Sequence, residues 1–301
     1  CQGEVAQVLK RMVDECVIWD SVTYVSVLGL CAQIRDLQLG LQIHAQGLVF
    51  DVSVGNTLID TYGKCREVLN ARKHFDGLQD RNVVAWTVIL TAYLQNGHFE
   101  ETLNLFTKME LEDPHPNEFT FAVLLTASAS MVALAYGDLL HGRIVKSGFK
   151  DHLIVGNALI NMYSKSGNID SSYSVFSNMM NRDVITWNAM ICGYSHHGLG
   201  KQALLVFQAM MSAGECPKYV NFIGVLYLAL IQEGFYYFDK LMKKSDIERG
   251  LEHYTCMVAL LGRVVLLDEA KNFMKTITHV KWDVVAWRTL LMFAMFIETT
   301  V

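Results

Sequence analysis

Residues 184–214 read VITWNAMICGYSHHGLGKQALLVFQAMMSAG, and this stretch decides the fold class. Its apolar residues recur at the spacing of one α-helical face in the first half and again in the second half. Gly198 interrupts the pattern between the halves, and Gly214 ends it. The stretch therefore predicts two amphipathic helices joined by a tight turn. One such hairpin cannot bury its own apolar face, so it needs neighbours of the same kind.

The hairpin pattern recurs along the chain at an offset of about 101 residues. Trp86 precedes Trp187 by 101 residues, Asn56 precedes Asn157 by the same number, and Trp287 follows Trp187 by 100. Superposition divides the chain into units at residues 1–20 (partial), 21–51, 52–82, 83–117, 118–152, 153–183, 184–218, 219–253 (shortened), 254–283 and 284–301 (truncated). We expect a single all-α domain over the whole chain. Its fold would be a right-handed α-solenoid superhelix of helix-turn-helix repeats with a concave inner surface.

The composition narrows the range of partners. The chain is 52% hydrophobic and 18% charged, which is typical of a folded protein with ample core. Its net charge of -5 argues against a strongly basic surface, so a nucleic acid would have to be held by base contacts and local positive patches. The longest apolar run, near residues 222–231, is too short to span a membrane. Seven scattered cysteines without a CxxC pair indicate a reducing compartment.

Two families of helical repeats have this period. The tetratricopeptide pattern fits Trp187, Tyr194 and the Ala203–Phe207 pair, but it places Gly where this chain has Ile191. The alternation of 31-residue and 35-residue units is also unusual for that family. The chain resembles much more closely the plant pentatricopeptide repeat family, in the PLS subclass whose P, L and S motifs alternate. The alternative that remains is a tetratricopeptide-like scaffold for protein–protein interaction.

Three kinds of unit carry the resemblance. A P unit opens VVAWTVILTAYLQNGHFEETLNLFTKM at Val83, and an S unit contains VGNALINMYSKSGNIDSSYSVFSNMMNRD from Val155. The L units contain FTFAVLL at 119–125 and VTYVSVL at 22–28, and each is followed by a helix with a histidine, His141 or His44. These motifs cover nearly the whole chain.

The resemblance implies binding of single-stranded RNA at about one base per repeat, with no membrane or DNA partner. In the family, the fifth and last residues of P and S motifs select the base. In this chain those positions are Asn56, Asn82, Thr87, Asn117, Asn157, Asp183, Asn188 and Lys218. An inner-helix side chain would meet a base edge, and the last residue would support it or add a second hydrogen bond.

By the family's code, each pair of residues resembles a particular reader. Thr87 with Asn117 resembles an adenine reader and Asn157 with Asp183 a uracil reader. Asn56 with Asn82 resembles a cytosine or uracil reader. The resulting track is pyrimidine-A-x-U.

Other positions would contribute less to selection. Lys218 departs from the usual Asn or Asp and would discriminate weakly. The L units offer Val25 and Ala122, which cannot hydrogen-bond a base, while Val84 and Ile185 are expected to sandwich bases.

The same polar residues have a purely structural interpretation. Asn82, Asn117 and Asp183 lie directly before predicted helices, where such side chains commonly act as N-caps. The sequence leaves both interpretations open.

A catalytic centre is not expected in this chain. Some relatives end in a DYW-type deaminase domain, whose zinc site needs HxE followed by PCxxC. His98-Phe99-Glu100 is an HxE without a PCxxC, and we interpret it as a turn between helices. His196-His197 is interpreted as a solvated helix end. We therefore expect no cofactor, no metal and no enzyme activity, since a deaminase domain would lie beyond Val301.

Location and further partners rest on the resemblance alone. It implies a mitochondrion or chloroplast, with a role in RNA editing or processing alongside editing-complex proteins. No targeting peptide is visible in the sequence.

Two L units are shortened by about one helical turn. The unit at 21–51 lacks residues after His44, and the unit at 219–253 lacks residues near 226–232. Val264-Val265 stands where the family usually has Gly. We expect local distortion near residues 45–50 and 226–232, within a superhelix that survives.

Overall fold

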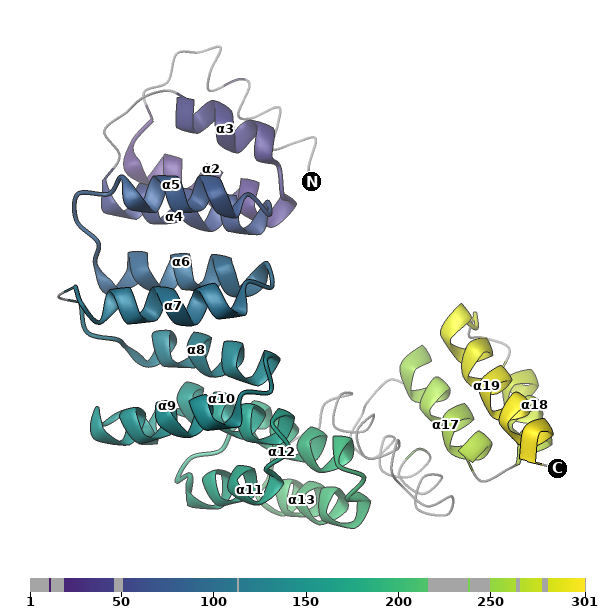
Figure 1. The fold of residues 1–301 in the computed structure, drawn as a ribbon. Coiled ribbons are helices and arrows are strands. Elements are labelled where there is room, and N and C mark those ends of the chain that lie inside the picture. The colour runs from purple at the N-terminus through teal and green to yellow at the C-terminus, as the bar shows by residue number, and fades with distance from the viewer. Residues whose placement is uncertain are drawn as a thin grey trace. The chain divides into compact units, whose positions relative to one another are not determined.

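The computed structural model describes residues 11, 19–45, 51–112, 114–215, 238, 250–263, 266–277 and 281–300. The regular elements in these ranges are helices, so the predicted all-α class is confirmed (Figure 1). Lys218, residues 46–50 and 226–232, and Val264-Val265 lie outside the described residues, so the expectations about them stay predictions.

The chain forms two compact units, Cys1–Ala127 and Ser128–Val301. The first contains α2 (Ser21–Ile34), α3 (Leu37–Ala45), α4 (Val52–Lys64), α5 (Val68–Asp76), α6 (Val83–Gln95), α7 (Phe99–Met109) and most of α8 (Glu118–Ser130). The second contains α9 (Leu134–Lys146), η1 (Phe149–Asp151), α10 (Leu153–Lys165), α11 (Ile169–Asn178), α12 (Val184–His196), α13 (Gly200–Ser212), α17 (Leu251–Arg263), α18 (Leu267–Thr276) and α19 (Val284–Thr300).

Each hairpin buries the apolar stripe that its sequence predicts. In α6, Trp86, Ile89 and Leu90 are buried, and in α7 they are matched by buried Phe106 and Met109. Neither stripe can be covered within one helix, so the two helices pack against each other, and α6 also packs on α4 and α5 of the preceding hairpin.

The described turns inside the hairpins from α2 to α13 each contain a left-handed residue. Gly97 and Gly198 have φ of 81° and 71°, a conformation that costs glycine little. The equivalent residues Arg35, Arg66 and Val132 adopt positive φ as well, at 56°, 66° and 54°. The geometry of the turn is therefore kept even where the side chain does not favour it.

Within each unit, the first helices of successive hairpins form one layer. The helices α2, α4 and α6 pack side by side in the first unit, and α10 packs on α12 in the second (Figure 1). The second helix of a hairpin also contacts the first helix of the next, as α5 does with α6 and α11 with α12. Residues at the start of consecutive first helices are thereby brought close together.

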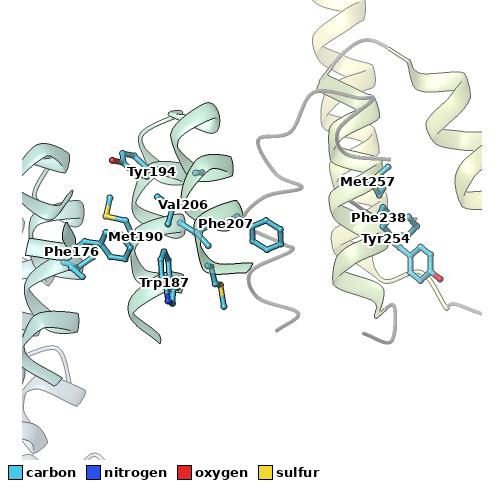
Figure 2. Close-up of a cluster of buried hydrophobic side chains, with 13 residues drawn as sticks. Phe176, Trp187, Met190, Tyr194, Val206, Phe207, Phe238, Tyr254 and Met257 are labelled. Atoms are coloured by element: carbon cyan, nitrogen blue, oxygen red, sulfur yellow. The ribbon is translucent and has the colours of Figure 1, made fainter. Parts of the chain in front are cut away.

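An aromatic pair repeats at two of these junctions. The rings of Phe75 and Trp86 pack edge to face with centroids 4.8 Å apart, and Phe176 and Trp187 do the same at 5.1 Å. In the second unit, Arg182 lies 4.8 Å from the Phe176 ring centroid and donates a hydrogen bond to the Phe176 carbonyl. Phe176, Trp187 and Met190 belong to one buried cluster (Figure 2). The cluster fixes where α12 begins relative to α11.

No helix in the described residues combines the length and hydropathy that a membrane crossing requires.

Candidate nucleic-acid interface

Three of the predicted base-recognition residues are the last residues of their repeat units, and each caps the helix that follows it. The Oδ1 of Asn82 accepts hydrogen bonds from the backbone N–H of Val84 and Ala85, at 3.1 and 3.0 Å. The Oδ1 of Asn117 accepts from the N–H of Thr120 at 2.9 Å. Asp183 forms a capping box with Thr186, whose N–H lies 2.8 Å from Oδ1. The N-cap interpretation is therefore confirmed for all three.

Capping does not use all the hydrogen-bonding atoms of these side chains. It engages Oδ1 and leaves the Nδ2 amide of an asparagine as a donor, or the Oδ2 of an aspartate as an acceptor. Asn82, Asn117 and Asp183 are all half-buried and thus still meet solvent. The cap and base recognition are compatible roles for one residue.

Thr87, the fifth residue of its unit, is connected to the last residue, Asn117. Its Oγ1 lies 2.8 Å from the Oγ1 of Thr120, which in turn donates to the Oδ1 of Asn117 at 2.9 Å. Because Thr120 donates its only hydroxyl proton to Asn117, Thr87 is the donor in the bond to Thr120; the Val83 carbonyl, 2.8 Å from the same Thr87 Oγ1, is an alternative acceptor for that proton. The structure thus brings together two positions 30 residues apart through one buried hydroxyl.

Asn157 and Asp183 are joined directly. The Nδ2 of Asn157 donates to the Oδ1 of Asp183 at 3.4 Å. Burial acts to raise the pKa of Asp183, but hydrogen bonds from Thr186 and Asn157 hold it below its ordinary value. Asp183 is therefore a carboxylate near neutral pH, and it can only accept hydrogen bonds.

Asn56 and Asn82 are not joined in the described structure. Asn56 is 8% exposed, and its buried Oδ1 has no hydrogen-bond partner among the described residues. The Oδ1 of Asn157 is likewise buried without a partner there, although its Nδ2 binds Asp183. Of the other predicted residues, Asn188 is half-buried on α12, and Lys218 lies outside the described residues.

Exposed apolar side chains flank the fifth residues. Val84 is 50% exposed and lies three residues before Thr87, on the same face of α6. Ile185 is 63% exposed and stands in the same relation to Asn188 on α12. Each of these faces therefore combines a polar group with an apolar surface on which a planar ring could pack.

A local positive patch lies at the other ends of the first helices. Arg35, Lys64 and Arg66 line a hollow of about 450 Å³ at the C-terminal ends of α2 and α4. Lys64 also pairs with Asp60 at 2.7 Å, which lowers the net charge of the patch. It is a small, local positive patch, as expected for a chain of net charge -5.

The histidine motifs belong to turns. His98 precedes α7 and packs its ring edge-on against Tyr93. His197 bonds through Nε2 to the carbonyl of Ser164 at 2.8 Å. In the part of the chain that the structure describes, no three His, Cys, Asp or Glu side chains gather as metal ligands would.

Thr120 and Thr186 were missed by reasoning from the sequence. Each is the third residue of a unit, and each bonds the last residue of the preceding unit. The signal was present as the spacings Asn117-x-x-Thr120 and Asp183-x-x-Thr186, which are those of a capping box.

Comparison with known proteins agrees with this architecture. Residues 81–130 match the model of the PPR repeat family, and residues 157–184 and 185–215 match the PPR repeat. Pentatricopeptide repeat-containing protein At5g39680 of Arabidopsis thaliana is 46% identical over 292 residues, covering 94% of this chain and 41% of that protein. Pentatricopeptide repeat-containing protein CRR2, chloroplastic, from the same plant is 37% identical over 270 residues, covering 85% and 41%.

The fold is also that of a solved repeat protein. The crystal structure of the pentatricopeptide repeat protein PPR10 in complex with an 18-nt psaJ RNA element superposes with a TM-score of 0.59 at 17% identity. The match covers 91% of this chain and 47% of that one. This chain spans less than half the length of these relatives. The repeat matches, the plant relatives and the shared fold together identify the chain as a pentatricopeptide repeat protein.

Proposed function

We propose that this chain binds single-stranded RNA in a sequence-specific manner, at about one base per repeat. The observation that carries the proposal is the pairing of fifth and last residues at the starts of neighbouring first helices. Asn157 meets Asp183 directly, and Thr87 meets Asn117 through Thr120. The RNA-bound PPR10 neighbour supports RNA as the partner, because it shares this fold.

The chemistry of these pairs suits the Watson–Crick edge of a base. A carboxylate such as Asp183 accepts a hydrogen bond from a base N–H, such as the N3–H of uracil. The Nδ2 amide of Asn82 or Asn117 instead donates, which suits a base with an unprotonated ring nitrogen such as cytosine or adenine. Val84 and Ile185 would pack against the base faces.

The order of the motifs sets the expected RNA. We propose alternating P, L and S motifs at the boundaries given by the 31-residue and 35-residue units. The S unit at 52–82, the P unit at 83–117 and the S unit at 153–183 would then read pyrimidine, adenine and uracil, with the L unit leaving one position unread.

The biological role follows from the relatives. Their names include a mitochondrial member and a chloroplastic member, which supports an organelle as the site of action. We propose that the chain contributes RNA recognition to editing or processing there, alongside editing-complex proteins. Any deaminase chemistry would be supplied outside residues 1–301.

The test is a selection from random single-stranded RNA with the purified chain, followed by sequencing and by titration of the enriched RNA. We expect enriched RNAs to contain pyrimidine-A-x-U. The logarithm of affinity should fall with the logarithm of salt concentration, at about −0.7 per phosphate contact. Binding of a charged peptide with no enrichment of any RNA would contradict the proposal and favour a protein-binding scaffold.

A further inference from the structure

In two of the predicted base-reading pairs, a buried threonine forms a hydrogen bond with the last residue of the pair. Thr120 is the third residue of α8, and Thr186 is the third residue of α12; both are 0% exposed. The Thr120 hydroxyl contacts Thr87 and Asn117, and the Thr186 hydroxyl donates to the Oδ1 of Asp183 at 2.8 Å. Neither hydroxyl is accessible, so each can act on a ligand only through the residues it holds.

A third pair, Asn56–Asn82, lacks this hydroxyl. The residue equivalent to Thr186 in the compact unit Cys1–Ala127 is Ala85, the third residue of the repeat unit 83–117, which lies 101 positions earlier. There the Oδ1 of Asn82 is bonded only by backbone N–H groups, and Asn56 makes no hydrogen bond to Asn82 in the described structure. Pairs with the threonine and a pair without it therefore occur in the same chain and can be compared directly.

The hydroxyl should affect selectivity through geometry. A cap held only by backbone N–H groups can shift its amide about the side-chain torsions, so its second polar atom is less well fixed. A hydroxyl donor at the carboxylate of Asp183 adds a second constraint on the same oxygen. The free Oδ2 is then presented in one orientation, and a base without a matching N–H leaves it unpaired.

We propose that Thr120 and Thr186 are positioning residues that set the base selectivity of the pairs Thr87–Asn117 and Asn157–Asp183, and that Ala85 leaves the Asn56–Asn82 pair less selective. This inference rests on the proposed RNA binding and extends it to residues that touch no base. The third residue of one repeat unit would then influence which base the preceding repeat unit selects.

The experiment compares variants of the full chain by RNA titration. Thr186→Ala removes the hydroxyl and installs the residue that the equivalent position already tolerates, while Thr186→Ser keeps the hydroxyl. For each protein we would measure the ratio of affinities for RNAs with uracil or cytosine opposite the Asn157–Asp183 pair. Thermal unfolding of each variant would be followed separately.

We expect Thr186→Ala to lower the uracil-to-cytosine ratio about tenfold and Thr186→Ser to restore it. A purely structural loss would weaken both RNAs equally and leave the ratio unchanged. In the opposite direction, Ala85→Thr should sharpen the choice between the two pyrimidines at the Asn56–Asn82 pair.

An unchanged ratio in Thr186→Ala with RNA still bound, or no rescue by Thr186→Ser, would overturn the inference alone. If the unaltered chain binds no RNA, the proposed function and this inference both fail.

Discussion

Asn157 and Asp183 are 26 residues apart in the chain, and the Nδ2 of one donates a hydrogen bond to the Oδ1 of the other. The contact exists because α10 packs on α12 and places the fifth residue of one helix beside the cap of the next. The cap, the inter-repeat contact and the proposed base-reading group are thus one cluster of atoms. Substitutions in this cluster should therefore show whether the free energy of unfolding and the base preference can be changed independently.

Asp183→Asn should change base preference without unfolding the helix. Asparagine caps as well as aspartate, so the free energy of unfolding should change by less than about 0.5 kcal/mol. The carboxylate acceptor becomes an amide donor, and preference at that position should move from uracil toward cytosine by about tenfold. RNA titration with the two bases measures the change.

The matched control is Asp51→Asn. Asp51 caps α4 in the same way, accepting from Val54 at 2.9 Å, but its unit has Val25 at the fifth position. Base preference should not move in this variant. A shift of equal size in both variants would show that the cap charge, and not the pairing with Asn157, governs selection.

Gly63→Ala should destabilise the first unit. A Cβ on Gly63 would lie 2.6 Å from the Cβ of Ala92 and 3.1 Å from its Cα, so α4 and α6 would have to move apart. We expect a loss of about 1–3 kcal/mol, measured by denaturant unfolding. Gly142→Ala, where a Cβ meets nothing within 4 Å, should instead stabilise α9 by about 0.5–1 kcal/mol. Similar effects of the two changes would contradict the tight packing of α4 on α6.

The sequence predicted much of this fold because its signals are local. Helical spacing around Trp86 and Trp187, glycine at Gly97 and Gly198, and capping residues before the helices all act within one or two turns. These signals specify the hairpins and their order.

What the sequence could not show depends on contacts between repeats. Asn56 and Thr87 occupy the same position in their units, yet Asn56 is buried and Thr87 is half-buried. The bridge from Thr87 to Asn117 requires Thr120 from the next helix, 33 residues away from Thr87. Such differences arise from how each helix packs on its neighbour, which periodicity does not encode.

Acid should destabilise the first unit through His74. Burial, together with the nearby His44, lowers the pKa of His74 to about 4, and burial with Lys73 lowers that of His44. The two rings pack edge to face at 5.0 Å, and His44 also bonds the Tyr62 hydroxyl. Between pH 6.5 and 4 the unfolded chain therefore binds a proton that the folded chain does not.

Stability should accordingly fall as pH drops through this window and stay constant above it. His74→Val, which installs the residue found at Val175 in the second unit, should weaken the dependence on pH between 7 and 5 in thermal unfolding. His196→Val, which removes an exposed histidine, should retain it. An unaltered pH profile in His74→Val would contradict the role of the buried ring.

Val132→Gly should stabilise the chain. Val132 has φ of 54°, a left-handed conformation that is strained for a β-branched residue. Glycine occupies the equivalent turns at Gly97 and Gly198, so the substitution should raise the free energy of unfolding by about 1 kcal/mol. Gly198→Val should lower it. A loss of stability in Val132→Gly, measured by denaturant unfolding, would contradict strain at this turn.

The central claim is that paired side chains at the starts of neighbouring first helices choose RNA bases. The most direct measurement is the affinity of the unaltered chain for pyrimidine-A-x-U RNA, and for the same RNA with its adenine changed to cytosine. We expect the change to weaken binding about tenfold, because Thr87 and Asn117 would face an edge with a different arrangement of donors and acceptors. Equal affinity for the two RNAs would contradict the assignment of this pair.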